Sequence, residues 1–233
     1  MKATDIQQKY FSDIGLSYDN GKKILNDIYS VDLPTFEKTT SQHQILFASI
    51  SINLKINNIL EIGTLDGVNA LFMSKLFKEA KITTLDLPDD DKTFTQTYNR
   101  ENNDIRTKFI SDRNKTLSLN KNIKFIQKNS INYLSSIKEK FDLIWVDGAH
   151  GAPDVVIDIT NSLRVLNTNG YLVCDDIFIK EVKDDQIYKS TAGFKTLLSF
   201  VNAGIIKKFN LIIKKFNNNE KFIAVVDGKN VSL

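Results

Sequence analysis

The segment Ile59–Gly67, with the sequence Ile-Leu-Glu-Ile-Gly-Thr-Leu-Asp-Gly, restricts the possible folds of this chain more than any other. Its apolar start leads into two glycines, Gly63 and Gly67, and Val68–Phe77 continues with helical periodicity. This order predicts a strand, a tight turn and a helix. In an open parallel sheet, such a turn lies at the carboxyl edge of a central strand, where glycine lets the backbone approach a ligand and the helix N-terminus presents free N–H groups. The segment therefore favours a nucleoside-type cofactor.

The spacing of the glycines helps to choose the cofactor. Nicotinamide dinucleotides are bound by G-x-G-x-x-G, but Leu65 stands at the position of the second glycine, and Glu61 precedes the turn. The resulting E-x-G-x-x-x-G pattern resembles the first motif of the class I S-adenosylmethionine (SAM) methyltransferases. SAM carries a sulfonium and an ammonium but no phosphate, so a nearby carboxylate suits its charge. A glycine turn in an unrelated α/β protein is the alternative, because short motifs also occur by chance.

Length and charge limit the class of protein. A chain of 233 residues suits one core, so we expect a single domain over residues 1–233, with an N-terminal helical region (1–57) and a SAM-binding α/β core (58–233). A net charge of +3 without a long basic block argues against nucleic acid as a partner. The single cysteine, Cys174, is expected to be a small buried hydrophobe. No apolar signal core or membrane-length stretch is present, which favours a cytoplasmic protein without a membrane partner.

The N-terminal region contains one clear helix signal. Ser41-x-x-Gln44 in front of an apolar run is a capping-box pattern, and it predicts a helix from Gln42 to Leu54. Thr39, Thr40 and Ser41 either cap this helix or face the cofactor. We expect His43, on the first turn, to be exposed.

The rest of the chain alternates between strand and helix patterns. A long polar segment, Thr93–Asn120, predicts one helix with a ragged end, and Val155–Leu166 predicts a helix closed by Asn169-Gly170. A terminal hairpin is expected from Phe209–Phe216 and Lys221–Val226. The order resembles the Rossmann-like class I methyltransferase fold, which implies a seven-stranded, mostly parallel α/β sheet with one antiparallel strand. The other strands after the glycine turn are expected at Lys81–Leu87, Asn122–Lys128, Phe141–Asp147 and Tyr171–Cys174.

Two further positions suit a nucleoside. Asp86 ends the second strand about twenty residues after the glycine turn, where a carboxylate accepts hydrogen bonds from ribose hydroxyls. One of Asp89, Asp90 and Asp91 could take that role instead, although these three are more typical of a solvated loop. Ser130 is either the N-cap of the following helix or a neighbour of the adenine.

Acidic residues follow two consecutive buried strands. Asp147 ends one, and Asp175 and Asp176 end the next, so all three are expected at one edge of the sheet. A hydroxyl is a poor nucleophile at neutral pH, and a divalent ion bound to its oxygen lowers its pKa while a base takes the proton. Carboxylates are ligands that Mg²⁺ prefers.

The pattern Asp147-Gly-Ala-His150 followed by Asp175-Asp176 resembles the metal-dependent O-methyltransferases that modify sugars of macrolide and aminocoumarin natural products. The resemblance implies Mg²⁺ or another divalent cation bound by Asp147, Asp175 and Asp176, with His150 as general base. Alternatively, Asp147 orients the SAM amino group and His150 is an ordinary loop residue. The resemblance also implies cofactor contacts at Glu61, Gly63, Thr64, Gly67, Asn69, Asp86, Ser130 and Asp147.

The sequence therefore predicts a SAM-dependent, Mg²⁺-dependent O-methyltransferase for a hydroxyl of a small molecule, with a sugar-containing metabolite favoured. The alternatives are a metal-independent methyltransferase or a hydroxylase on the same scaffold, an NAD-dependent oxidoreductase, and a SAM-binding protein without turnover. Acceptor contacts are expected from Met1–Thr40 and Phe178–Lys189, the latter as a lid. Sugar-modifying enzymes of this type also suggest a homo-oligomer.

Overall fold

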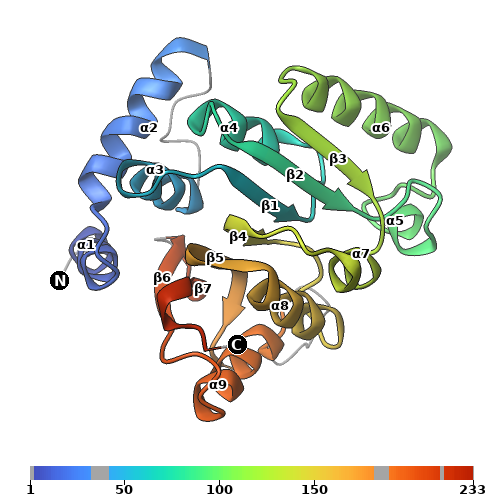
Figure 1. Ribbon diagram of the computed structural model, residues 1–233. Helices are drawn as coiled ribbons and strands as arrows, with labels where there is room; N and C mark the ends of the chain where they lie inside the picture. The colour runs from blue at the N-terminus through green and yellow to red at the C-terminus, as the bar shows by residue number, and fades with distance from the viewer. Residues whose placement is uncertain (1–2, 33–41, 181–188, 216–217, 233) are drawn as a thin grey trace.

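A seven-stranded sheet with the order β3-β2-β1-β4-β5-β7-β6 forms the centre of the molecule (Figure 1). The computed structural model describes residues 3–32, 42–180, 189–215 and 218–232. β1 to β5 run parallel, and β7 is antiparallel to both β5 and β6. The predicted, mostly parallel sheet with one antiparallel strand is therefore confirmed. The strands are β1 (Asn58–Ile62), β2 (Lys81–Asp86), β3 (Ile123–Gln127), β4 (Phe141–Val146), β5 (Leu166–Phe178), β6 (Asn210–Lys215) and β7 (Asn218–Asp227).

Helices cover both faces of the sheet (Figure 1), and each face has its own apolar core. Successive residues of β4 enter opposite cores: Trp145 packs with Phe47 on one face, and Ile144 with Leu163 on the other. The first face carries α1 (Ala3–Asp13), α2 (Tyr18–Asp32), α3 (His43–Asn53), α4 (Val68–Leu76) and α6 (Asn103–Ser118). The second carries α7 (Ser130–Ser136), α8 (Asp154–Val165) and α9 (Ala192–Asn202), while α5 (Lys92–Gln96) and a 3₁₀ turn (Gly228–Asn230) are short.

Two predicted helix boundaries are wrong. The Thr93–Asn120 segment forms two helices, because Asp91 caps α5 and Asn102 starts α6 by accepting hydrogen bonds from N–H groups of the first turn. α8 ends at Val165 and leads directly into β5, so Gly170 lies within a strand. The backbone of Asp142 passes so close that a Cβ at Gly170 would lie 2.6 Å from its carbonyl oxygen. Close backbone approach, rather than helix termination, requires this glycine.

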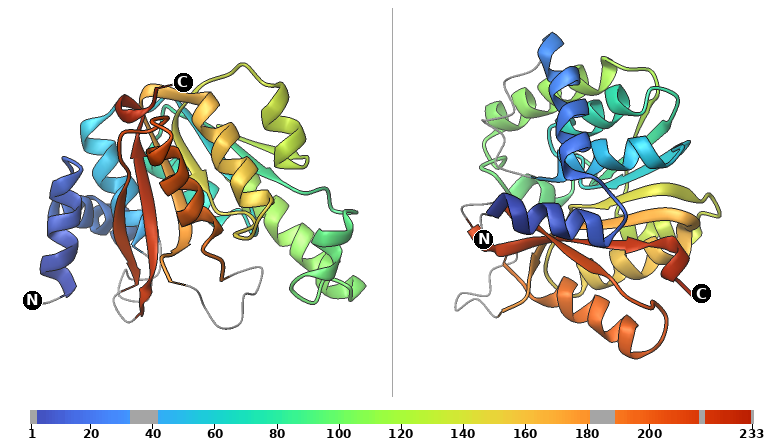
Figure 2. Two further views of the ribbon diagram at one scale, coloured as in Figure 1. Left: turned by 90° about the horizontal axis from the view of Figure 1, so that it is seen from below. Right: turned by 90° about the vertical axis from the view of Figure 1, so that its left-hand side faces the viewer.

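The N-terminal helices cover the free edge of β6. Figure 2 (right) shows α1 running alongside the β6–β7 pair. The buried Gln7 donates to the carbonyl of Ile213 and accepts from its N–H, both at 2.9 Å, as a neighbouring strand would. The N–H of Gln42 donates to the carbonyl of Lys214 at 2.9 Å. These contacts satisfy the edge of the sheet and hold β6 in place.

The helix predicted from Gln42 to Leu54 is confirmed as α3, but Gln42 makes no side-chain cap. The predicted capping residues Thr39, Thr40 and Ser41 lie outside the described residues, as does most of the predicted lid. Within the described part of the chain, no helix combines the length and the apolar character needed to cross a membrane.

Candidate active site

The glycine turn after β1 packs directly against the end of β4. Gly63 has a φ of 100° and Gly67 a φ of 77°, values that glycine adopts readily. A Cβ on Gly63 would lie 2.2 Å from the carbonyl oxygen of Asp147, and one on Gly67 would lie 2.7 Å from Leu117 Cδ2. The N–H of Asp147 donates to the Ile62 carbonyl at 2.8 Å. The turn and the first predicted acid are therefore parts of one rigid unit.

Glu61 lies beneath this turn and is fully buried. Asn69 Nδ2 donates to its Oε1 at 2.7 Å, and Thr84 Oγ1 donates to its Oε2 at 2.5 Å. Thr64 Oγ1 lies 2.6 Å from Thr84 Oγ1 and extends the network into the turn. Burial raises the pKa of Glu61 to about 7, although both hydrogen bonds oppose this shift. Glu61 thus supports the turn from below, and its predicted contact with the cofactor stays a prediction.

Asp86 reaches the same turn from the end of β2. Its Oδ2 accepts from the N–H of Leu65 at 2.9 Å, and its Oδ1 accepts from the N–H of Leu87 at 2.8 Å. Burial raises its pKa. A carboxylate oxygen can accept two hydrogen bonds, so each oxygen of Asp86 can still accept one from a ribose hydroxyl. Of the alternatives, Asp89 is paired with Arg113 at 2.7 and 2.9 Å, and Asp91 caps α5.

The sequence suggested Ser130 as a possible cap of α7, but the structure shows that it is not the cap. Asn129 is the cap, because its side-chain oxygen accepts from the N–H of Ile131 at 2.9 Å. Ser130 instead hydrogen-bonds to Asp158, a buried carboxyl of α8 whose pKa burial raises to about 6. Its predicted place beside the adenine stays a prediction.

His43 lies close to the site, and the expectation that it is exposed is wrong. Its ring stacks on Trp145 with centroids 5.3 Å apart, and its edge contacts Phe47. Burial lowers its pKa to about 4, while the carboxylate of Asp175 and a hydrogen bond with Asn69 act in the opposite direction. The sequence did contain a signal that this helix is buried. The run from Ile45 to Ile50 has no polar face, and a helix that is apolar on all sides is packed against other elements on all sides.

The two later acids do not follow the end of β5. The strand continues to Phe178, and its pairing with β7 shifts register between Cys174 and Ile177. Asp176 lies in this irregularity with a φ of 48°, a left-handed conformation that is unfavourable for a non-glycine residue. A bulge of this kind redirects side chains, and here both Asp175 and Asp176 are largely buried at the edge next to Asp147.

His150 lies in the loop that follows Asp147, and its ring nitrogen Nε2 is close to two of the predicted acids. Its Nε2 is 3.7 Å from Asp147 Oδ1 and 3.9 Å from Asp176 Oδ2. Burial lowers the pKa of His150, which favours the neutral imidazole that a general base requires. Burial and the adjacent Asp175 carboxylate together raise the pKa of Asp147 well above its usual range. The structure thus brings together the four predicted residues.

Two lysines that the sequence analysis missed complete this cluster. Lys214 Nζ of β6 lies 2.5 Å from Asp175 Oδ2 and also donates to Asp176 Oδ1. Lys221 Nζ of β7 lies 2.9 Å from Asp176 Oδ2. No sequence signal could have identified them, because the chain contains many lysines and only the β5-β7-β6 pairing brings these two to the acids.

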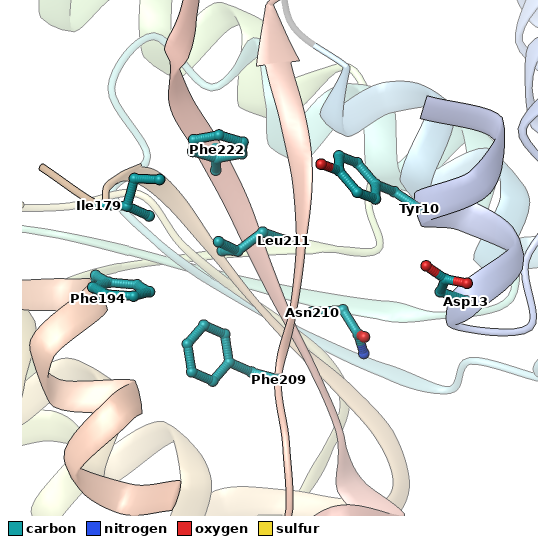
Figure 3. A pocket seen from close by; sticks show the side chains of 8 residues that line it. All are labelled: Tyr10, Asp13, Ile179, Phe194, Phe209, Asn210, Leu211 and Phe222. Atoms are coloured by element: carbon teal, nitrogen blue, oxygen red, sulfur yellow. The ribbon is translucent and has the colours of Figure 1, made fainter. Parts of the chain in front are cut away.

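A cavity of about 440 Å³ lies elsewhere in the molecule. It opens beside β6, between α1 and α9 (Figure 3). None of the predicted cofactor or metal residues lines it, so it is distinct from the candidate active site. Its lining consists of Tyr10, Asp13, Ile179, Phe194, Phe209, Asn210, Leu211 and Phe222.

Comparison with known proteins identifies the family. A family model described as a methyltransferase domain matches residues 60–177, which is just over half of the chain. The chain belongs to this methyltransferase family. The matched segment contains the glycine turn, Asp86, His150 and all three acids of the cluster.

Solved methyltransferase structures share the fold at low sequence identity. An O-methyltransferase from Bacillus cereus in complex with SAH is 17% identical with a TM-score of 0.55, and 90% of each chain is covered. The O-methyltransferase TomG from Streptomyces achromogenes, involved in tomaymycin synthesis and in complex with SAM, is 14% identical with a TM-score of 0.55; 94% of this chain and 95% of TomG are covered. Among curated protein sequences, none matches the chain.

Proposed function

We propose that this methyltransferase transfers a methyl group from SAM to a hydroxyl of a small molecule, with a sugar-containing metabolite as the favoured acceptor. The observation that carries the proposal is that His150 Nε2 lies 3.7 Å from a carboxylate oxygen of Asp147 and 3.9 Å from one of Asp176, while the backbone of Asp147 packs against the glycine turn. The cofactor-bound O-methyltransferases of the same fold support it.

The residues around the turn fit SAM. Asp86 offers acceptor capacity for ribose hydroxyls, and the carboxyl of Asp147 suits a cationic amino acid moiety. When bound, SAM supplies an electrophilic methyl group. The pattern for a pyrophosphate is lacking because Leu65 replaces a glycine, which argues against NAD.

The residues of the cluster provide the proton chemistry. A neutral His150 accepts the proton of the acceptor hydroxyl as the oxygen–methyl bond forms, and the carboxylates of Asp147 and Asp176, both near Nε2, stabilise the resulting imidazolium. Proton removal is what an alcohol or sugar hydroxyl needs to become a competent nucleophile.

The predicted Mg²⁺ site does not fit this arrangement of side chains. Of the residues that the structure describes, no three histidine, cysteine, aspartate or glutamate side chains are arranged to hold a metal ion. Asp175 and Asp176 already accept hydrogen bonds from Lys214. Mg²⁺ dependence therefore stays a prediction from the sequence, and these contacts favour the metal-independent alternative.

Calorimetry with SAM and NAD, followed by a radiolabelled methyl-transfer assay on hydroxylated metabolites, tests the proposal. We expect SAM to bind, NAD not to bind, and labelled methyl to appear on a hydroxyl. His150→Ala should lower turnover about 100-fold or more and remove the acidic limb of the pH profile. A rate within a few fold of wild type across pH would reject His150 as the base, and SAM binding without turnover on any acceptor would favour a binding protein.

A further inference from the structure

Lys214 is placed at the centre of the acidic cluster. Its ammonium bridges a carboxylate oxygen of Asp175 at 2.5 Å and one of Asp176, and only 11% of the side chain is exposed. Lys221 binds the second oxygen of Asp176 at 2.9 Å. The two lysines thus bring two positive charges to the three aspartates, which is the charge that one divalent cation would supply.

The backbone around Lys214 is fixed by contacts that are far away in the sequence. Gln42 donates to the carbonyl of Lys214 itself, and Gln7 makes two hydrogen bonds to the preceding residue, Ile213. On the inner side, Ile213 and Lys215 pair with β7, and Lys214 lies at the irregularity between them. Lys214 is therefore presented to the acids from a strand whose neighbouring residues are bonded on both sides, rather than from a loop.

An ammonium in this position competes directly with a metal ion. Mg²⁺ requires near-octahedral oxygen ligands at about 2.0–2.1 Å and gives up its water reluctantly. Asp175 Oδ2 and both oxygens of Asp176 already accept from a lysine. A divalent ion on the same carboxylates would also lie close to the buried positive charge of Lys214, with little water to screen the repulsion.

We infer that the ammonium of Lys214 takes the place of the divalent cation in this active site, so that Asp175 and Asp176 anchor an internal lysine rather than a metal. The catalytic consequence rests on the proposed function. Lys214 acts as a positioning residue: it fixes Asp175 and Asp176, and thereby holds Asp176 against the imidazole of His150.

Mn²⁺ binding, followed by electron paramagnetic resonance, tests this inference without any need for SAM or an acceptor. We expect the wild type to show no Mn²⁺ binding below millimolar concentrations and to keep its turnover in excess chelator. Lys214→Met frees Asp175 Oδ2 and Asp176 Oδ1, so this variant should bind Mn²⁺ at least tenfold more tightly. Its turnover should fall at least tenfold and recover in part when Mg²⁺ is added.

Two controls keep the test independent of folding and of general charge effects. Lys214→Arg keeps the cation, so it should not gain Mn²⁺ affinity. Lys215→Met removes the neighbouring positive charge but keeps the lysine that Asp175 and Asp176 accept from, so it should behave as the wild type. Circular dichroism and SAM calorimetry are run on each variant.

Micromolar Mn²⁺ binding by the wild type, or loss of its turnover in chelator with recovery in Mg²⁺, would overturn the inference. A folded Lys214→Met variant that gains no Mn²⁺ affinity would also overturn it. Failure of SAM to bind would instead refute the proposed function, and the Mn²⁺ result would remain interpretable.

Discussion

The cofactor edge, formed by the ends of β1 and β2, and the acidic edge, formed by the end of β4 and the bulge of β5, are built in different ways. At the cofactor edge, Asn69 and Thr84 donate to the two carboxylate oxygens of Glu61 from within about twenty residues of sequence. At the acidic edge, Asp175 and Asp176 receive their cations from Lys214 and Lys221, about forty residues later. A local sequence motif therefore contains most of the partners at the cofactor edge. At the acidic edge it contains the aspartates but not the lysines that bind them.

The two edges touch at Gly63, and breaking this contact should have the largest effect. Gly63→Ala places a Cβ 2.2 Å from the Asp147 carbonyl oxygen at a φ of 100°. We expect loss of measurable SAM binding and a fall of about 3 kcal/mol or more in the free energy of unfolding, measured by calorimetry and urea denaturation. Gly15→Ala is the matched control, because Gly15 has a φ of 73° but open space around its Cβ position. Equal losses in both variants would show that backbone strain alone is responsible.

Asp147 lies where the two edges meet, so a substitution there shows whether it contributes to proton transfer or to SAM binding. Asp147→Asn keeps the shape of the side chain but removes its ability to carry a negative charge beside His150. We expect turnover to fall about 100-fold to 10,000-fold while SAM affinity changes little. Calorimetry and steady-state kinetics separate the two effects, with the exposed Asp154→Asn as control. A parallel loss of SAM affinity would assign Asp147 to the cofactor edge, as a partner of the SAM amino group.

Asp158, behind the acidic edge, contrasts with the fully satisfied Glu61. It bonds to Ser130, but its Oδ1 has no hydrogen-bond partner in the described part of the chain. Its pKa is raised from 3.8 to about 6, so the folded state binds the proton more tightly, and the stability from this group is lost as pH rises through about 6.

Asp158→Asn removes that pH dependence. Relative to the wild type, we expect the variant to gain up to about 3 kcal/mol in the free energy of unfolding between pH 4 and pH 8. Urea denaturation across this range measures the gain. A difference that does not change with pH would show that Asp158 is ionised in the folded protein throughout.

Thr84→Val should have the smallest effect and act on the cofactor edge alone. The change removes the hydrogen bond to the buried Glu61 and the one shared with Thr64, which should cost about 1–2 kcal/mol and weaken SAM binding about tenfold. The catalytic constant should stay near that of the wild type. Thr83→Val, on the opposite face of β2, is the matched control, and a fall in the catalytic constant of Thr84→Val would contradict the separation of the two edges.

Local patterns were sufficient for much of this molecule. The strand, glycine turn and helix at Ile59–Gly67, and the alternation that follows it, predicted the methyltransferase family and its fold, and both are confirmed. The pattern also predicted that Asp147, Asp175 and Asp176 lie at one edge of the sheet, and the family resemblance added His150. The structure brings the four together, although Asp175 and Asp176 lie at an irregularity within β5 rather than after its end. The predictions that failed, such as an exposed His43 and a capping role for Ser130, depend on which neighbour a side chain meets.

The sequence by itself determined the sheet, the glycine turn and the gathering of the acids at one edge, because hydrophobic periodicity and glycine conformation act over a few neighbouring residues. Only the tertiary structure decided which cation lies among those acids. Lys214 reaches them because β7 reverses the chain and Gln7 and Gln42 hold β6 at its edge. A lysine has no local signature for such a position, since its electrostatic role depends on charges that are close in space but distant in sequence.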